Sequence, residues 1–267
     1  MIDDWDSYFC TVEDKPSSIV VNLGLAEEAD AISHPVLCYV SIFLRNPDPE
    51  GFPAPDEEET IAAMEDSLVE SFHAPDTGRC AGHCLTDGRL DVFFYLDSGD
   101  NWSERVAAVL DHFPSHQWEA GSHDDPEWEL YFGFLYPDDV CMLHIQNRRV
   151  CDQLTEQGDD LSVSRRLEHL AIFRSHENAT TFAAIAKEMG YALDSIDSME
   201  ETDPLAEMEQ DGQEPFSMAT GSASLRVWQV RLSRPDCPDA SDEISLLLFN
   251  LAREHNGEYF GWSCAAL

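Results

Sequence analysis

Strand and helix patterns occur along this chain in the order strand, helix, strand, strand, helix, strand, and the whole order occurs twice. A helix against a core repeats hydrophobic residues every three or four positions, whereas a half-buried strand alternates hydrophobic and polar residues. This order is that of the βαββαβ, ferredoxin-like motif. No clear sequence repeat relates the two copies, so we predict a repeated architecture rather than a repeated sequence.

An additional strand pair precedes the first copy. The polar turn Glu13-Asp14-Lys15-Pro16 separates two strand patterns and predicts a hairpin over residues 5–25. The first helix has an acidic first turn, which suits the positive end of the helix dipole. Its apolar face consists of Ile61, Met64, Leu68 and Phe72. The other expected elements of this copy are strands over 36–44, 80–85, 90–96, around Trp118 and over 128–136, and helices over 55–72 and after Asp100.

A segment with helical spacing leads into the second copy and predicts a linking helix that ends near Gly158. In the second copy, Asn178 is expected to cap a helix that Gly190 ends. The expected elements of this copy are strands over 169–174, 191–198, 224–231 and 258–265, and helices over 178–190 and 241–255.

These patterns predict an α+β protein made of two ferredoxin-like (βαββαβ) α/β-sandwich units in tandem, the first with an extra N-terminal β-hairpin. We place the first domain at residues 1–140, the linking helix at 141–160 and the second domain at 161–267.

The charge of the chain limits its partners. It contains 15 Lys and Arg against 53 Asp and Glu, so its formal net charge is −38, while 43% hydrophobic residues are enough for a folded core. Binding to nucleic acid or to an anionic membrane surface needs Lys and Arg and is excluded over most of this surface. A partner protein with a basic surface fits the charge, and adaptation to a high-salt cytoplasm remains an alternative explanation.

The N-terminal residues are acidic and lack the apolar core of a signal peptide, and no run approaches the ~18 apolar residues of a transmembrane helix. The eight cysteines are scattered through hydrophobic segments, which is typical of free thiols in a reducing compartment. We therefore expect a cytoplasmic protein.

Two groups of Cys and His residues are candidates for catalysis or metal binding. Cys80, His83 and Cys84 lie on one expected strand, where Cys80 and Cys84 would share one face and His83 the other. No second ligand pair follows at zinc-site spacing, so buried core thiols are the alternative. The second group consists of His112, His116 and His123, in which Pro114 would interrupt a helix between the first two.

Two charged groups are candidates for binding. A long acidic loop is expected over 199–222, as a solvated loop or a partner-binding element whose acids include Glu200, Glu201, Asp203, Glu207, Glu209 and Asp211. Four of the 15 bases lie close together, either pairing with carboxylates or binding phosphate: Arg148, Arg149, Arg165 and Arg166.

The C-terminal part, from about Arg165, resembles RraB, the regulator of ribonuclease E activity B. The resemblance rests on the segment Phe182–Tyr191, on the strand over 224–231 and above all on Leu251–Trp262, which contains Tyr259, Gly261 and Trp262 in a Tyr-x-Gly-Trp pattern. The resemblance implies a small acidic ferredoxin-like protein that binds ribonuclease E and inhibits it without chemistry of its own.

The first ~150 residues resemble an uncharacterised bacterial domain that often precedes an RraB-like domain. The resemblance is carried by residues 5–9, Pro47 to Gly51, Asp87-Gly88-Arg89 with Phe93-Phe94-Tyr95, and residues 146–150. Its motifs define a fold rather than a catalytic site.

Our leading hypothesis is a non-enzymatic, acidic regulatory protein that binds a basic surface of another protein and needs no cofactor or metal. The second hypothesis is a small hydrolase that depends on Cys and His or on a metal. The third is a structural scaffold that forms a homodimer through an exposed sheet face.

Overall fold

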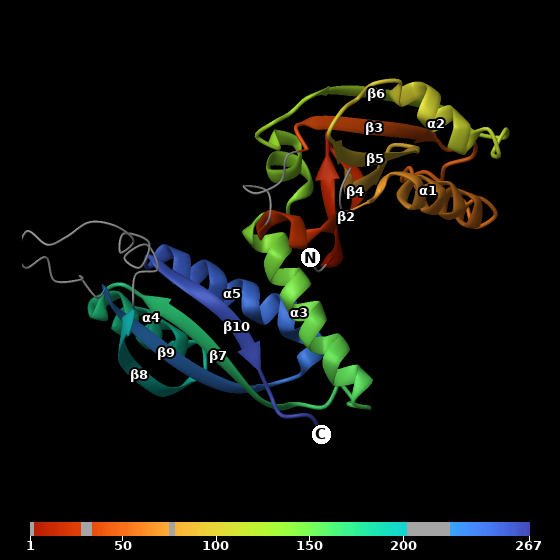
Figure 1. Cartoon of the computed structure of the whole chain (residues 1–267). Coiled ribbons are helices and arrows are strands. Elements are labelled where there is room, and N and C mark those ends of the chain that lie inside the picture. Colours follow the sequence, from red (N-terminus) through yellow and green to blue (C-terminus); the bar gives the residue numbers. More distant parts are fainter. Residues whose placement is uncertain (1–2, 28–33, 75–77, 202–224) are drawn as a thin grey trace, which may run out of the picture. The chain divides into compact units, whose positions relative to one another are not determined.

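A computed structural model describes residues 3–27, 34–74, 78–201 and 225–267. The chain is an α+β protein with two antiparallel sheets, and it divides into two compact units, Met1–Ile145 and Gln146–Leu267. The elements of both units are labelled in Figure 1. None of the described helices is long and apolar enough to span a membrane.

Most elements of the first unit lie where the patterns predict them. They are β1 (Trp5–Val12), β2 (Lys15–Asn22), η1 (Leu23–Glu27), β3 (Val36–Phe43), α1 (Glu58–Phe72), β4 (Gly78–Thr86), β5 (Arg89–Leu96), α2 (Trp102–Leu110), β6 (Gln117–Asp124) and η2 (Tyr131–Leu135). Helix α3 (Asp139–Glu156) begins in this unit and ends in the second.

The first sheet is antiparallel, with the strand order β1-β2-β4-β5-β3-β6. Helices α1 and α2 cover one face (Figure 1), and the four predicted residues of α1 are buried there. The predicted β1–β2 hairpin is confirmed and extends the sheet beyond β4. A second hydrophobic cluster fills the other face.

The strand predicted over 128–136 is wrong, because this segment contains the π-helical turn η2. Trp128, Tyr131 and Leu135 are all buried, at helical rather than alternating spacing. The Trp128 indole stacks on the Tyr95 ring of β5 at 3.9 Å between ring centres. The segment therefore covers a sheet face instead of adding a strand.

The second unit follows the predicted order of elements. They are β7 (Arg165–Phe173), α4 (His176–Glu188), β8 (Ala192–Glu201), β9 (Leu225–Asp236), η4 (Pro238–Ala240), α5 (Ser241–Glu254) and β10 (Gly257–Ser263). Its antiparallel sheet has the order β10-β7-β9-β8.

The ends of α4 correct one prediction and confirm another. The cap is Ser175, not Asn178: the Ser175 hydroxyl accepts from the Asn178 backbone N–H at 3.5 Å. Asn178 is the third residue of the first turn and donates the capping bond, so it is not itself the cap. Gly190 follows the helix with a φ of +91°, the left-handed conformation that glycine supplies at helix ends.

Candidate protein-binding face

One face of the second sheet is not covered by helices α4 and α5. Phe173 of β7 packs against Phe182 of α4, with 4.9 Å between ring centres, which identifies the helix-covered face. Because neighbouring residues of a strand point to opposite faces, Leu170 and Ile172 lie on the other face. We call the surface made by Leu170, Ile172, Gln229, Arg231 and Phe260 the open face.

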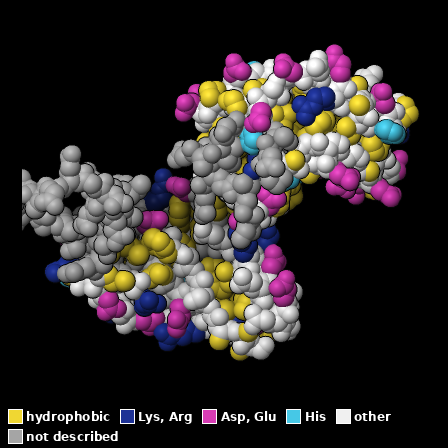
Figure 2. Space-filling view, in the orientation of Figure 1, with side chains coloured by type: hydrophobic (Ala, Val, Ile, Leu, Met, Phe, Trp, Pro, Cys, Tyr) yellow, Lys and Arg dark blue, Asp and Glu magenta, His cyan; other side chains and the backbone are white. Residues whose placement is uncertain are grey.

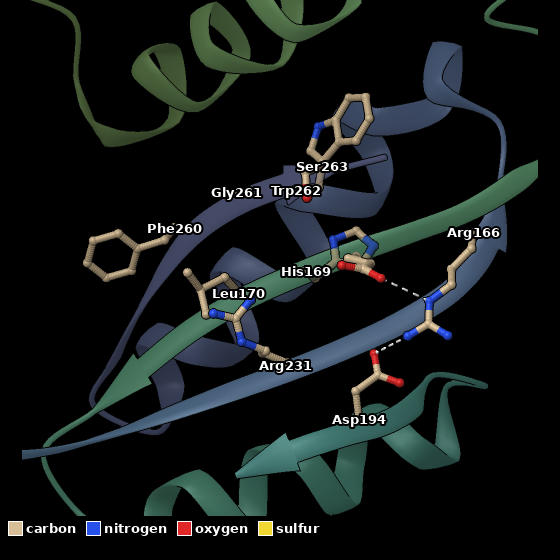
Figure 3. Close-up of a pocket in the computed structure, with 10 residues that line it drawn as sticks. Arg166, His169, Leu170, Asp194, Arg231, Phe260, Gly261, Trp262 and Ser263 are labelled. Atoms are coloured by element: carbon tan, nitrogen blue, oxygen red, sulfur yellow. Dashed lines mark ion pairs between the residues drawn. The ribbon is translucent and has the colours of Figure 1, made fainter. Parts of the chain in front are cut away.

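A pocket of about 370 Å³ lies on the open face. Arg166 forms ion pairs at its edge, with Glu168 at 3.2 Å and Asp194 at 2.9 Å, which are drawn in Figure 3. These pairs are largely exposed, so each contributes little stability and remains free to exchange for a partner's charges. Figure 2 shows hydrophobic, basic and acidic side chains interspersed on the surface of this unit.

A β-bulge places Phe260 on the surface. The register between β10 and β7 shifts between Tyr259 and Gly261, and Gly261 has a φ of +101°. A regular strand would put Tyr259 and Trp262 on opposite faces, but the extra residue of the bulge buries both. Phe260 is consequently 51% exposed. Sequence patterns do not reveal this residue, because a bulge interrupts the alternation on which they depend.

The Trp262 side chain fixes β10 to the helices through a buried polar network. Its indole Nε1 donates to Asn147 Oδ1 of α3 at 2.9 Å. The Asn147 amide donates in turn to Asp242 Oδ1 at 2.8 Å and Ser245 Oγ at 2.7 Å, both on α5. The network therefore joins the Tyr-x-Gly-Trp segment to residues 146–150, the two stretches that carry much of the resemblance.

His169 of β7 is buried beside Tyr259, with 2.8 Å between its Nδ1 and the Tyr259 hydroxyl. Burial lowers the pKa of His169 to about 4, because the charged imidazolium loses its hydration. In the unfolded chain the imidazole takes up its proton near pH 6.5. Its stabilising contribution is therefore complete above pH 6.5 and is lost as the pH falls toward 4.

We expect the protonation of His169 to lower the unfolding free energy of the second unit by about 3 kcal/mol when the pH falls from 7 to 4. Denaturant unfolding at several pH values, followed by hydrogen exchange of the β7 amides, measures the loss. The carboxylates also titrate in this range, so the comparison is with His169→Gln, which cannot titrate. Parallel pH curves for the two proteins would contradict the assignment.

The predicted acidic site lies only partly within the described residues. Glu200 and Glu201 belong to the end of β8, whereas Asp203, Glu207, Glu209 and Asp211 lie outside the described residues.

Of the four clustered arginines, Arg165 pairs with Asp159 and Arg166 with Glu168 and Asp194, as the carboxylate-pairing interpretation predicts. Arg148 and Arg149 lie on α3.

The predicted facing of Cys80, His83 and Cys84 is wrong. The register between β4 and β5 shifts between Cys80 and Gly82, so a bulge reverses the alternation after Cys80. Cys80 lies in the cluster beneath α1 and α2, whereas Cys84 lies in the cluster on the other face. His83 points to the helix side, where its Nδ1 is 2.5 Å from Glu65 Oε1 of α1.

Both thiols are poor candidates for nucleophiles. All eight cysteines are free. Burial raises the pKa of Cys84 to about 12 and that of Cys80 further still. Since the thiolate is the reactive form, neither environment favours nucleophilic catalysis.

The three candidate histidines do not converge. His116 is buried against Glu57, His123 lies on β6, and the exposed His112 is near the Val109 carbonyl. Within the described ranges, no group of three or more His, Cys, Asp or Glu residues is placed to hold a metal ion.

Comparison with known proteins finds a family match in each half of the chain. Residues 3–136, half of the chain, match the family described as "Family of unknown function (DUF695)", so the chain belongs to that family. Residues 144–264 match the family described as "Regulator of ribonuclease activity B" (RraB). The resemblances of both halves, in the order predicted from the sequence, are thus confirmed.

Other comparisons add little. No curated protein matches the chain. A solved structure, described as "Crystal Structure of an Unknown Protein from Galdieria sulphuraria", is 9% identical and covers 86% of this chain and 99% of its own. Its TM-score of 0.24 is too low to carry an argument about the fold.

Proposed function

We propose that this chain is a non-enzymatic regulator that binds a ribonuclease through the open face and lowers its activity. The RraB match over residues 144–264 carries the proposal, since that family is described as a regulator of ribonuclease activity. The open face supports it, because Phe260 and Arg166 are exposed there. Aromatic and arginine side chains are enriched in protein interfaces. Ribonuclease E is the enzyme that we propose as the partner.

The charge of the chain supports a partner with a basic surface. A net charge of −38 steers a basic protein toward this chain and repels RNA. We propose that the acidic positions Glu200, Glu201, Asp203, Glu207, Glu209 and Asp211 contribute to this steering. We also propose that the protein acts in the cytoplasm.

We further propose that both units are ferredoxin-like. The order β10-β7-β9-β8 supports this assignment for the second unit, as does β4-β5-β3-β6 within the first sheet. In both, the two central strands are the first and third of a strand-helix-strand-strand-helix-strand series.

The open face predicts the effect of one substitution. We expect Phe260→Ser to weaken binding to purified ribonuclease E at least about tenfold, because truncation of a buried interface aromatic costs more than about 1.4 kcal/mol. Biosensor binding of the full chain and cleavage of a fluorogenic RNA measure the effect. Leu247→Ser is the matched control, because Leu247 is 53% exposed but lies on helix α5. Equal losses in both variants, or none in either, would overturn the proposed interface.

A second arm tests the acidic positions. Replacing all six with Asn or Gln should lower the association rate and flatten its dependence on salt between 0.05 and about 0.5 M, since screening acts mainly on long-range steering. A complex indifferent to salt in the unmodified chain would contradict the electrostatic part of the proposal.

A homodimer through the same face is an alternative function for the open face. Sedimentation of the chain alone distinguishes it: a dimer that Phe260→Ser converts to monomers would favour the scaffold hypothesis. A monomer that binds the ribonuclease supports the regulator.

A further inference from the structure

The face of the first sheet opposite α1 and α2 contains a second pocket, of about 550 Å³. This volume lies within the range of about 300–1,000 Å³ that small-molecule sites occupy. Strands β3, β5 and β6 form its floor, with residues of the β1–β2 hairpin, of the β4–β5 turn and of the segment around η2 at its edges. Neither family description assigns it a role.

Aromatic side chains form the apolar wall of this pocket. Tyr39 of β3 stands between Phe93 of β5 and Gly121 of β6 in the strand register. The Tyr39 ring occupies the space left by Gly121, where a Cβ would lie 2.5 Å from the Tyr39 hydroxyl oxygen. Phe134 packs edge-on against Phe93, with 6.1 Å between ring centres.

Two residues further along β3, on the same face, two acids flank Ser41. Asp91 of β5 accepts from the Ser41 hydroxyl at 2.5 Å and from Arg89 Nε at 2.8 Å. Glu119 of β6 lies on the other side of Ser41 and is exposed. In the described part of the chain, Glu119 has no hydrogen-bond or ion-pair partner. The pocket thus offers an unused carboxylate next to aromatic rings.

The remaining charges around the pocket also favour a cation. Its Lys and Arg side chains are already paired, Arg89 with Asp91 at 2.8 Å and Lys15 with Asp87 at 3.3 Å, and His123 is the other nitrogen base that lines it. Glu13 adds a further carboxylate. Residues 1–145 hold 31 of the 53 acidic residues and five of the 15 basic ones, so the field of the whole unit attracts cations.

We propose that this pocket binds a guanidinium group on an alkyl stem, either free or as the arginine side chain of a protein. A planar guanidinium stacks on aromatic faces and pairs with a carboxylate through two hydrogen bonds, which a compact ammonium cannot do. The stem lies along Tyr39, Phe93 and Phe134 while the head group meets Glu119. The proposal does not depend on a ribonuclease partner.

Two-dimensional NMR titration of the full chain with agmatine tests the proposal, with the acetylated and amidated peptide Gly-Arg-Gly as the protein-derived probe. We expect saturable shifts at Tyr39, Ser41, Phe93 and Glu119, and no binding of the neutral analogue N-butylurea. Glu119→Gln should weaken binding at least fivefold. Glu104→Gln carries the same charge change on α2, across the sheet, and should leave the affinity within twofold.

The possible results of this titration lead to different conclusions. Tighter binding of the peptide identifies a protein side chain as the ligand, and tighter binding of agmatine identifies a free one. Equal weakening by Glu119→Gln and Glu104→Gln, or tighter binding of cadaverine than of agmatine, overturns the proposal. So does the absence of shifts in the pocket.

Discussion

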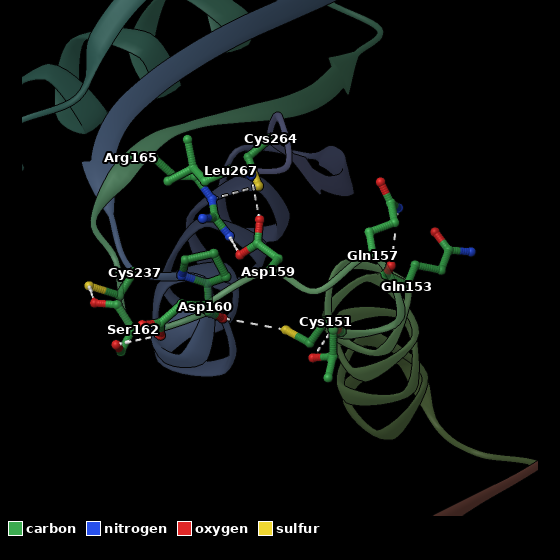
Figure 4. Close-up of polar contacts among 12 residues, drawn as sticks. Cys151, Gln153, Gln157, Asp159, Asp160, Ser162, Arg165, Cys237, Cys264 and Leu267 are labelled. Carbon is green, nitrogen blue, oxygen red and sulfur yellow. Dashed lines mark hydrogen bonds and ion pairs between the residues drawn. The ribbon is translucent and has the colours of Figure 1, made fainter.

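Replacing Asp159 with Ala should destabilise the second unit by about 3–5 kcal/mol, one of the largest losses that a single change in this chain can cause. The Asp159 side chain is fully buried, and Arg165 is 7% exposed. Asp159 Oδ1 pairs with Arg165 Nη2 at 2.5 Å, while Oδ2 accepts from the Leu267 backbone N–H at 2.7 Å (Figure 4). The variant would leave a buried guanidinium without its carboxylate.

Hydrogen exchange of the β10 amides, combined with denaturant unfolding of the full chain, measures this loss. Asp152→Ala is the matched control, because Asp152 is an exposed acid on α3 and should lose less than about 0.5 kcal/mol. Adding Arg165→Met to Asp159→Ala should recover part of the stability, since the unpaired charge is then removed. A loss below about 1 kcal/mol for Asp159→Ala would show that water reaches Arg165.

In the first unit, we expect Glu57→Ala to cost about 3 kcal/mol, because three donors lose their acceptor in a buried site. Glu57 accepts from the backbone N–H of Arg45 at 2.8 Å and of Asn46 at 3.3 Å. The side chain of His116 completes the set, with 2.7 Å between its Nε2 and Glu57 Oε1. This carboxylate ties the loop after β3 to the start of α1 and to the segment after α2.

The same site predicts a dependence on pH. Burial by itself raises the pKa of Glu57, but the hydrogen bonds from Arg45, His116 and Asn46 outweigh burial and hold the pKa below its usual value. Its contribution is therefore complete above the unfolded value near pH 4.5 and is lost as the pH falls through the lowered folded value. The difference between wild type and Glu57→Ala should shrink in that range.

Denaturant unfolding at pH 7 and below pH 4, read out by hydrogen exchange in α1, checks both expectations. Glu59→Ala is the control, since Glu59 is exposed in the first turn of the same helix and should cost well under 1 kcal/mol. If Glu57→Ala lowered the unfolding free energy no more than Glu59→Ala does, water would replace the lost hydrogen bonds and the prediction would be wrong.

Sequence patterns locate the elements that are governed by local periodicity. The face made by Ile61, Met64, Leu68 and Phe72 is buried as the spacing predicts, and the hairpin turn at Asp87-Gly88 joins β4 to β5. Helical and strand periods depend only on neighbouring residues, so one sequence suffices to find them. The same holds for the family resemblances, whose motifs are short contiguous segments of the sequence.

The sequence does not predict to which face of the sheet the side chains after a β-bulge point. In β4 and in β10 one extra residue reverses the alternation, which separates Cys80 from Cys84 and brings Tyr259 and Trp262 to the same face. The position of a bulge depends on the neighbouring strand and on the side chains packed against the sheet. These partners can be distant in the sequence, so local periodicity does not reveal the bulge.

The sequence by itself determined the order of most strands and helices, the family resemblance of each half and the strongly acidic charge. Only the tertiary structure decided that Phe260 is exposed, that Tyr39 and Glu119 line one pocket, and that residues 128–136 cover a sheet instead of extending it. The physical reason is that periodicity is a property of neighbours along the chain. Pockets, bulges and buried pairs depend on residues that meet only after folding.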